Sequence, residues 1–335
     1  IGKIGSDSNN VYIGATSNAG EIIFRNNVGS TDAPHSSGTN KFVIGDNDIR
    51  TPTTGTSNVR LGVNAGNSIL DGGNYNTVVG DEAGTAITTG DGMVAIGYQA
   101  LMTEDAQGHS TAVGASALKM QNSGGTSYNV AVGSEAGVAV STGVQNTLIG
   151  SKAGLALAGG DGVVAVGFEA LMTEDGNGNS VAVGRQALRT QNAGAEAYNV
   201  AVGNGAGFNV STGVQNTLIG GVAGDALQTG EANVVIGYNA GGVGDNWSRC
   251  VAVGRAALGN HNPSGTSSTV TANVAVGYDA LTTCNTGTNN TAIGYQAGQD
   301  LQGGDNNVFI GLQAGDDTVS GASNVAIGSG ALSAN

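Results

Sequence analysis

Short apolar stretches recur along the chain at a nearly constant interval, and each one ends in glycine. A phrase of the type Asn-Val-Ala-Val-Gly occurs sixteen times, and most neighbouring copies lie 17 residues apart. The glycines that end the phrase, here called anchor glycines, are Gly62, Gly80, Gly97, Gly114, Gly133, Gly150, Gly167, Gly184, Gly203, Gly220, Gly237, Gly254, Gly277, Gly294, Gly311 and Gly328. A fixed period of this length predicts a parallel β-solenoid (β-roll), in which each repeat forms one coil stacked on the next.

A longer period is superimposed on the first. The spacings Gly80 to Gly150 and Gly150 to Gly220 are both 70 residues, and ALMTED occurs at 100–105 and again at 170–175. Four coils therefore form one superunit. The extra residues of the longer coils follow Leu118, Leu188 and Leu258. We expect them to protrude as one loop per four coils on the same edge, as candidate contact points.

Each phrase has the two-residue alternation of a strand. The residue before the anchor glycine is always Val, Ile or Leu, and the residue three before it is always Val or Thr. We expect these two positions to face the interior of the coil. The glycine is expected to end the strand by turning with a backbone angle that a side chain would oppose.

Alanine stands three residues after the anchor glycine in all sixteen coils, which predicts a tight corner that admits one methyl group. The structural core is therefore predicted to include Ala83, Ala100, Ala117, Ala136, Ala153, Ala170, Ala187 and Ala206.

The residue after this alanine is Gly or Leu, and its identity predicts the residue three positions later. Gly84 is followed by the apolar Ile87, whereas Leu101 is followed by Glu104. We interpret this exchange as one core space that is filled from either of two positions, because close packing tolerates neither a void nor two large side chains. The exceptions are Gly241 with Val243, Gly315 with Val319, and Leu281 with Cys284.

The residue two before the anchor glycine is apolar in every coil except at Arg60. With its neighbours facing inward, this residue is expected to face outward and to form an apolar strip that other chains cover. A homotrimer is the simplest closed arrangement. The predicted oligomer interface comprises Ala95, Ala112, Ala131, Leu148, Ala165, Ala182, Leu218 and Phe309.

Asparagine stands four residues before the anchor glycine in eleven coils, for example at Asn76 and Asn146. Stacked in successive coils, these side chains are predicted to form an amide ladder.

Composition narrows the class of protein. Sixty glycines with three prolines exclude collagen and ordinary helical packing, and a net charge of −14 disfavours nucleic acid. No apolar stretch is long enough to predict membrane insertion. Cys250 and Cys284 are too few for a disulfide framework and occupy non-equivalent positions, so we expect two free thiols that are buried or half-buried.

The sequence contains few candidate catalytic or ligand-binding residues. His35, His109 and His261 are isolated and are expected in solvated loops, and no catalytic cluster is predicted, so we expect no enzyme and no cofactor. Gly-rich stretches such as GGDGVVAVG depart from the calcium-binding nonapeptide pattern, which leaves calcium as a minor alternative. Tyr278 and Tyr295 follow anchor glycines of adjacent coils and are the candidate receptor contacts, against the simpler interpretation of aromatics covering the side wall.

The units NTAIGYQAG at 290–298 and NVAVGYDAL at 273–281 resemble repeats of bacteriophage tail fibres. They are also similar to the heads of trimeric autotransporter adhesins, which are parallel β-rolls with a shorter repeat. The lead-in segments IGSDSNNVYIG and EIIFRNN resemble short β segments of phage fibres. The resemblance implies a homotrimer in a virion that contacts a host cell-surface receptor, glycan or protein, without turnover.

Two regions are expected: a short N-terminal β connector at 1–57 and a β-solenoid of sixteen coils at 58–335. The connector contains strand-like segments at 10–14 and 41–45. The leading hypothesis is a structural or receptor-binding segment of a trimeric phage tail fibre that mediates attachment to the host. The alternatives are a bacterial cell-surface trimeric adhesin head, an ice-binding solenoid that needs a regular array of Thr, and a glycan-cleaving tailspike.

Overall fold

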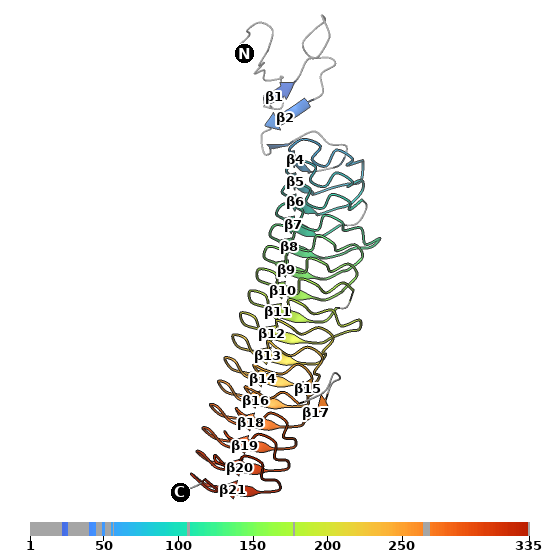
Figure 1. Ribbon diagram of the computed structural model, residues 1–335. Coiled ribbons are helices and arrows are strands. Elements are labelled where there is room, and N and C mark those ends of the chain that lie inside the picture. The colour runs from blue at the N-terminus through green and yellow to red at the C-terminus, as the bar shows by residue number, and fades with distance from the viewer. Residues whose placement is uncertain are drawn as a thin grey trace, which may run out of the picture.

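The computed structural model describes residues 22–25, 40–44, 49–50, 55, 57–105, 108–176, 178–263 and 269–333. These residues form strands and turns without a helix, and the strands make three sheets. The large sheet has sixteen strands and belongs to a long stack of coils (Figure 1). The predicted all-β parallel solenoid is confirmed.

Every strand of the large sheet is three residues long, and each ends at the residue before an anchor glycine. The strands are β4 (Val59–Leu61), β5 (Thr77–Val79), β6 (Val94–Ile96), β7 (Thr111–Val113), β8 (Val130–Val132), β9 (Thr147–Ile149), β10 (Val164–Val166), β11 (Val181–Val183), β12 (Val200–Val202), β13 (Thr217–Ile219), β14 (Val234–Ile236), β16 (Val251–Val253), β18 (Val274–Val276), β19 (Thr291–Ile293), β20 (Val308–Ile310) and β21 (Val325–Ile327).

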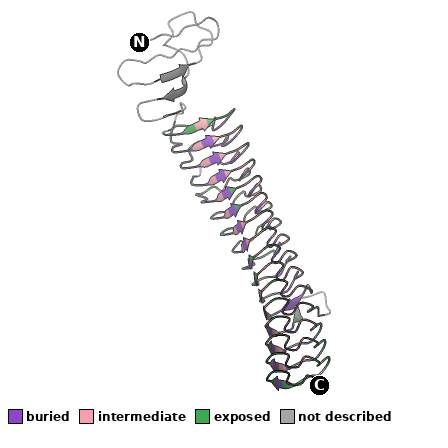
Figure 2. Cartoon of the chain, turned by 90° about the vertical axis from the view of Figure 1, so that its left-hand side faces the viewer, coloured by how far each residue is buried: buried purple, intermediate pink, exposed green. Residues whose placement is uncertain are grey.

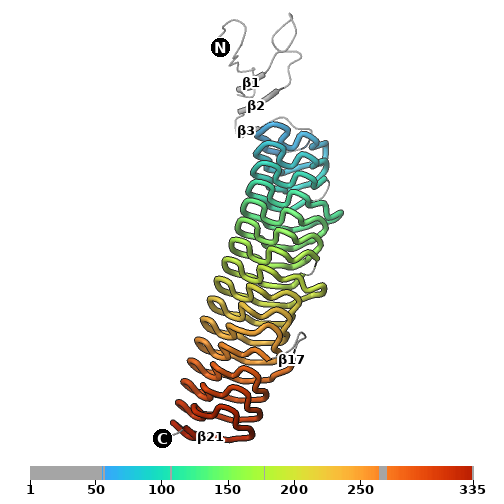
Figure 3. The backbone as a smooth tube through the Cα atoms, in the orientation of Figure 1, coloured from blue at the N-terminus to red at the C-terminus, as the bar shows by residue number. Residues whose placement is uncertain are grey.

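Equivalent positions of neighbouring coils pair in parallel, so that Ala165 of β10 lies beside Ala182 of β11. The opposite wall of the coil is also linked from coil to coil. Leu101 N donates to Ala117 O at 3.0 Å, and Leu118 N donates to Ala136 O at 3.0 Å. The tube in Figure 3 shows the resulting regular stack of narrow coils. Backbone hydrogen bonds along both walls therefore hold the coils in register.

The two smaller sheets lie outside this series. β1 (Ile22–Arg25), β2 (Asn40–Ile44) and β3 (Ile49–Arg50) form an antiparallel sheet, and β2 covers residues 41–44 of the strand predicted at 41–45. The predicted strand at 10–14 lies outside the described residues. β15 (Trp247–Ser248) pairs in parallel with β17 (Thr269–Val270) beside the longest insertion.

The anchor glycines are required for two reasons. Their φ angles lie between +117° and +142°, a region that side chains oppose. A β-carbon on Gly97 would also stand 2.5 Å from the carbonyl oxygen of Gly114 in the next coil. The predicted conformational role is confirmed, and the close stacking of one glycine on the next adds to it.

The predicted facing of the strand is wrong. The middle residue is buried and the flanking residues are partly exposed, as in the pattern of β6, where Ala95 is fully buried. Figure 2 shows this buried band along the strands between less buried ends. The interface candidates are therefore core residues, each with 0% exposure: Ala95, Ala112, Ala131, Leu148, Ala165, Ala182, Leu218 and Phe309. Alternation fixes which positions share a face but not which face is inside, because both sets are apolar here.

The predicted core alanines are confirmed as buried, and all eight have 0% exposure. The exchange between the residue after the corner alanine and the residue three positions later is also a packing effect. A β-carbon on Gly84 would stand 2.6 Å from Cδ1 of Ile87, so the isoleucine fills the space that Leu101 fills in the next coil. Leu101 occupies this position with a φ of +48°, a conformation that costs about 1–2 kcal/mol in a non-glycine residue.

The structure explains two of the exceptions to this exchange. Val243 and Val319 are 46% and 49% exposed. The indole of Trp247 lies against Gly241 instead, with Cζ2 at 2.7 Å from a β-carbon built there. The ring of Phe309 lies at 2.5 Å from the corresponding point on Gly315. Larger side chains from other positions therefore fill these coils.

Where Leu follows the corner alanine, a polar residue often stands three positions later. In the coil of Leu118 this residue is buried and hydrogen-bonded. Gln121 is buried and donates from Nε2 to Glu104 Oε2 at 2.8 Å and to Ser110 Oγ at 3.1 Å. Asn129 donates to Gln121 Oε1 at 2.9 Å. These bonds satisfy the buried polar groups, whose burial would otherwise be unfavourable.

The asparagine column forms the predicted ladder, with a contribution from the backbone. Asn146 Oδ1 accepts from Val163 N of the next coil at 2.9 Å, and Nδ2 donates to Gly160 O at 2.7 Å. Asn146 N in turn donates to Asn129 Oδ1 at 2.8 Å. Each buried asparagine thus fastens one coil to the next.

His261 lies in the core beside the longest insertion, so its predicted placement in a solvated loop is wrong. This residue is fully buried, not in a solvated loop, and shares Thr271 as a neighbour with Cys250. Both cysteines are free and buried, as predicted. Burial raises the pKa of Cys284 to about 12 and also raises that of Cys250.

His109 is exposed, and its ring lies 5.6 Å from that of Tyr128. His35 lies outside the described residues.

Candidate functional site

The outer face of the sixteen-stranded sheet is the most extensive candidate surface. The first and last residues of each strand lie on it in two columns, one of Val and Thr and one of Val, Ile and Leu. None of these residues is charged, although the chain carries a net charge of −14. Ile149, Ile219 and Ile293 are 38%, 37% and 40% exposed. We call this surface the apolar sheet face.

The apolar sheet face is large for a protein surface in water. At ~4.8 Å per coil, sixteen coils extend for about 75 Å, and a strand of three residues is about 10 Å wide. The face therefore covers roughly 750 Å², more than the largest apolar patch of most soluble monomers. It is close to the area that one partner contributes to a standard specific interface, about 800 Å².

The second candidate surface is a column of side chains directly after the anchor glycines. Tyr278 and Tyr295 are 41% and 48% exposed, and their rings stack with centroids 5.2 Å apart and planes inclined by 10°. The guanidinium carbon of Arg255 lies 5.0 Å from the centroid of Tyr278. Arg255 Nη1 also donates to the Tyr278 hydroxyl at 2.8 Å and lies 3.4 Å from Asp279 Oδ1. The two predicted receptor contacts are thus brought together.

This stack limits what the tyrosines can bind. The facing sides of the two rings cover one another, and Arg255 lies over Tyr278. Tyr278 therefore offers little open ring face on which a sugar ring could stack. Stacking between Arg and aromatic side chains is worth about 0.5–1 kcal/mol at exposed sites, which is consistent with the alternative role of covering the side wall.

The insertion loops form a third set of surfaces. Residues 122–126 and 192–196 lie mostly exposed, and a β-carbon on Gly124 or Gly194 would meet no atom within 4 Å. Both loops project from the same edge of the stack (Figure 3). Tyr128 and Tyr198, at the ends of these loops, are 56% and 50% exposed. Part of the third insertion, 264–268, lies outside the described residues.

The described residues contain neither a metal-binding cluster nor a membrane-spanning helix. No three His, Cys, Asp or Glu side chains come together there as a metal site. None of the described segments is a helix of the length and apolarity needed to cross a bilayer. Searches for similar proteins found no matching family model, no matching curated protein and no matching solved structure.

The apolar sheet face was missed in the sequence although the sequence contains a signal for it. Every coil with Leu in the corner has Ala in the middle of its strand, as in Leu101 with Ala95. The large middle residues Val78, Leu148, Leu218, Val235 and Phe309 occur only with Gly in the corner. Residues that trade volume share one space, so this correlation places the middle of the strand inside.

Proposed function

We propose that this chain is a stiff segment of a homotrimeric tail fibre in a virion and mediates attachment to a host cell surface. The observation that carries the proposal is the apolar sheet face. Strands that are apolar on both faces are normally covered on both faces, and here one face packs on the core while the other meets solvent. The fold itself is a repetitive rod, which suits a spacer between a base and a receptor.

Copies of the same chain are the best occupants of the apolar sheet face. The two columns continue from coil to coil along the whole sheet. A second copy of the chain has the same spacing between coils, so its columns can match those of the first along the full length. A cyclic trimer gives each copy two neighbours, one for each column, and leaves no face open. The resemblance to phage fibres and trimeric adhesins supports the same assembly.

The solution mass of the folded protein tests this assembly. We expect three copies of the 32.7 kDa chain by light scattering. The double variant Val166→Lys/Val183→Lys places two charges on the outward ends of β10 and β11 and should give monomers with an unchanged circular dichroism spectrum. Asn122→Lys, on an exposed loop, is the matched control and should remain trimeric. A monomeric wild type would overturn the proposal, and a dimer would overturn the threefold arrangement.

A bacterial cell-surface trimeric adhesin head is the alternative with the same physical support. The complete reading frame separates the two. A self-cleaving chaperone domain downstream supports the fibre, whereas a secretion signal with a C-terminal membrane anchor supports the adhesin.

We further propose that the chain is not catalytic. Asp316 is the described carboxyl group whose pKa is raised by burial together with two neighbouring carboxylates, Asp300 and Asp317. These side chains lie in turns, and Asp317 is exposed. Glycan-cleaving activity that disappears in Asp316→Asn would show the proposal to be wrong.

Ice binding has one observation in its favour. The threonines of the strands, including Thr77, Thr111 and Thr147, lie on the outward face and not inside as predicted. They occupy five of the sixteen strands, and valine holds the same position in the rest. A regular threonine array is therefore incomplete, and we expect no thermal hysteresis.

A further inference from the structure

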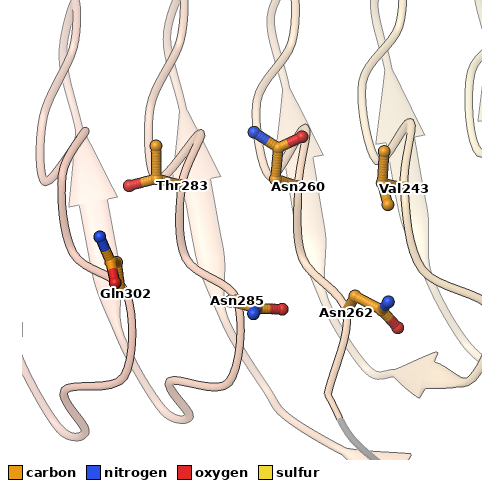
Figure 4. Close-up of a pocket in the computed structure, with 6 residues that line it drawn as sticks. All are labelled: Val243, Asn260, Asn262, Thr283, Asn285 and Gln302. Atoms are coloured by element: carbon orange, nitrogen blue, oxygen red, sulfur yellow. The ribbon is translucent and has the colours of Figure 1, made fainter.

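A shallow groove crosses four consecutive coils in the C-terminal half of the stack, away from the aromatic column described above. It has a volume of about 380 Å³. The residues that line it are Val243, Asn260, Asn262, Thr283, Asn285 and Gln302. Figure 4 shows them in two rows that run from coil to coil, with Val243, Asn260 and Thr283 in one row and Asn262, Asn285 and Gln302 in the other. The coil repeat therefore presents polar groups at a regular step.

The three carboxamides of the second row are free to bind a ligand. Asn262, Asn285 and Gln302 are exposed, and their side chains make no hydrogen bond to any residue in the described part of the chain. The position of Asn285 differs from its equivalents in earlier superunits, where a serine bonds to the backbone. Ser141 Oγ donates to Ala158 O and Ser211 Oγ donates to Gln228 O, both at 3.1 Å. At this one position the groove has an open carboxamide in place of a hydrogen-bonded serine.

Backbone hydrogen bonds hold the residues of the second row in register from coil to coil. Asn262 N donates to Asn285 O at 3.0 Å, and Asn285 N donates to Gln302 O at 2.9 Å. Thr283 Oγ1 donates to Gln299 O, which fixes the hydroxyl at the edge of the first row. The backbone therefore sets the spacing of the carboxamides, and a ligand has to order only the side chains themselves.

The chemistry of the lining points to a neutral, hydroxyl-rich ligand. A carboxamide both donates and accepts, so it can pair with a hydroxyl group in either sense. The lining contains no Lys or Arg to attract an anion, and the chain as a whole is acidic. The rows repeat every ~4.8 Å along the stack, which suits an extended chain of similar units. Val243, at one end, offers an apolar contact for the C–H face of a sugar.

We propose that this groove binds a neutral oligosaccharide that lies along the axis of the stack. The proposal names the receptor class for the attachment function above and rests on it. The tyrosine column and the groove are separate surfaces, so the two can be tested independently.

The test is a glycan array of neutral and sialylated oligosaccharides, followed by calorimetric titration of the best neutral binder. In Asn262→Asp/Asn285→Asp, the loss of two amide donors and the gain of two negative charges should weaken neutral binding at least tenfold. Asn192→Asp is the matched control, because Asn192 is the superunit equivalent of Asn262, is exposed and lies outside the groove. It should bind like the wild type.

Three results would overturn the groove assignment. They are the absence of any neutral glycan that binds, neutral binding that survives the double substitution, and binding that Asn192→Asp weakens equally. Light scattering on the same samples tests the trimeric assembly separately from glycan binding. A trimer that binds no neutral glycan overturns the groove alone, whereas a monomer overturns the proposed fibre.

Discussion

The side chain of Leu148 fills the space beside Gly154: a β-carbon on this glycine would stand 2.8 Å from Leu148 Cδ2, closer than two carbons can approach. In the coil of Ala95, the same space is filled from the corner by Leu101, and both residues have 0% exposure. Two positions on opposite walls of the coil therefore share one volume.

This shared volume predicts a strong coupling between two substitutions. Leu148→Ala should lower the free energy of unfolding by about 2–5 kcal/mol because it leaves a cavity. Gly154→Leu alone should also destabilise, by about 1–3 kcal/mol from overpacking and about 1–2 kcal/mol from its left-handed backbone, where φ is +57°. The double variant should lose clearly less than the sum of the two. Urea unfolding of the four proteins measures the coupling, and strict additivity would contradict a shared volume.

The glycine stack predicts a severe effect of one added methyl group. Gly97→Ala should destabilise by more than about 3 kcal/mol, because φ is +130° there and the methyl group meets the Gly114 carbonyl. Gly125→Ala is the control, since nothing lies within 4 Å of a β-carbon at this loop position and its φ is not positive. Thermal unfolding should separate the two variants, and equal melting temperatures would show that the coils can shift apart at no cost.

The asparagine ladder predicts a loss of stability without a loss of apolar packing. Asn146→Ala leaves Val163 N without its acceptor and Gly160 O without its donor, both inside the coil. Two unsatisfied buried groups should cost about 2–4 kcal/mol. Asn122→Ala, at an exposed position, should change stability by less than about 0.5 kcal/mol in the same urea titration. A small effect at Asn146 would indicate that water replaces the amide.

His261 predicts a pH dependence of stability. Desolvation lowers the pKa of this buried residue from 6.5 to about 4, and its neutral form suits its neighbours. Nδ1 donates to Cys284 O at 2.9 Å, while Nε2 lies 3.0 Å from the Thr271 hydroxyl and 3.4 Å from the Asn273 amide. Trp247 packs against the ring, at 5.9 Å between centroids. Between pH 6.5 and 4, the unfolded chain binds a proton that the folded chain does not. Stability from this group is therefore complete above pH 6.5 and is lost as the pH falls.

The matched variant for this prediction is His261→Gln, because Gln121 and Gln191 occupy the equivalent positions in other superunits and are buried. Between pH 7 and pH 4.5, the wild type should lose about 2 kcal/mol more stability than the variant. Urea unfolding at the two pH values measures the difference. Identical losses would show that acidic residues alone govern the acid sensitivity.

The sequence by itself determined the solenoid, its period of 17 residues, the anchor glycines, the alanine corner and the stacked asparagines. A repeat makes each of these visible, because one structural requirement is tested sixteen times along the chain. The pairing of Tyr278 with Tyr295 was predicted for the same reason, since neighbouring coils place equivalent residues side by side.

Only the tertiary structure decided where Trp247 and His261 lie and which polar side chains remain open in the groove. It also corrected the facing of the strand, for which the sequence carries a signal in the exchange of volume between the middle residue and the corner but not in its alternation. In a strand of three residues with apolar groups on both faces, alternation is symmetric and leaves the direction open. In the folded coil the direction is fixed by packing, because the middle residue shares one space with the corner, as Leu148 does with Gly154. The residues at the irregular coil around the longest insertion follow from local packing, which occurs once and therefore leaves no repeated pattern to detect.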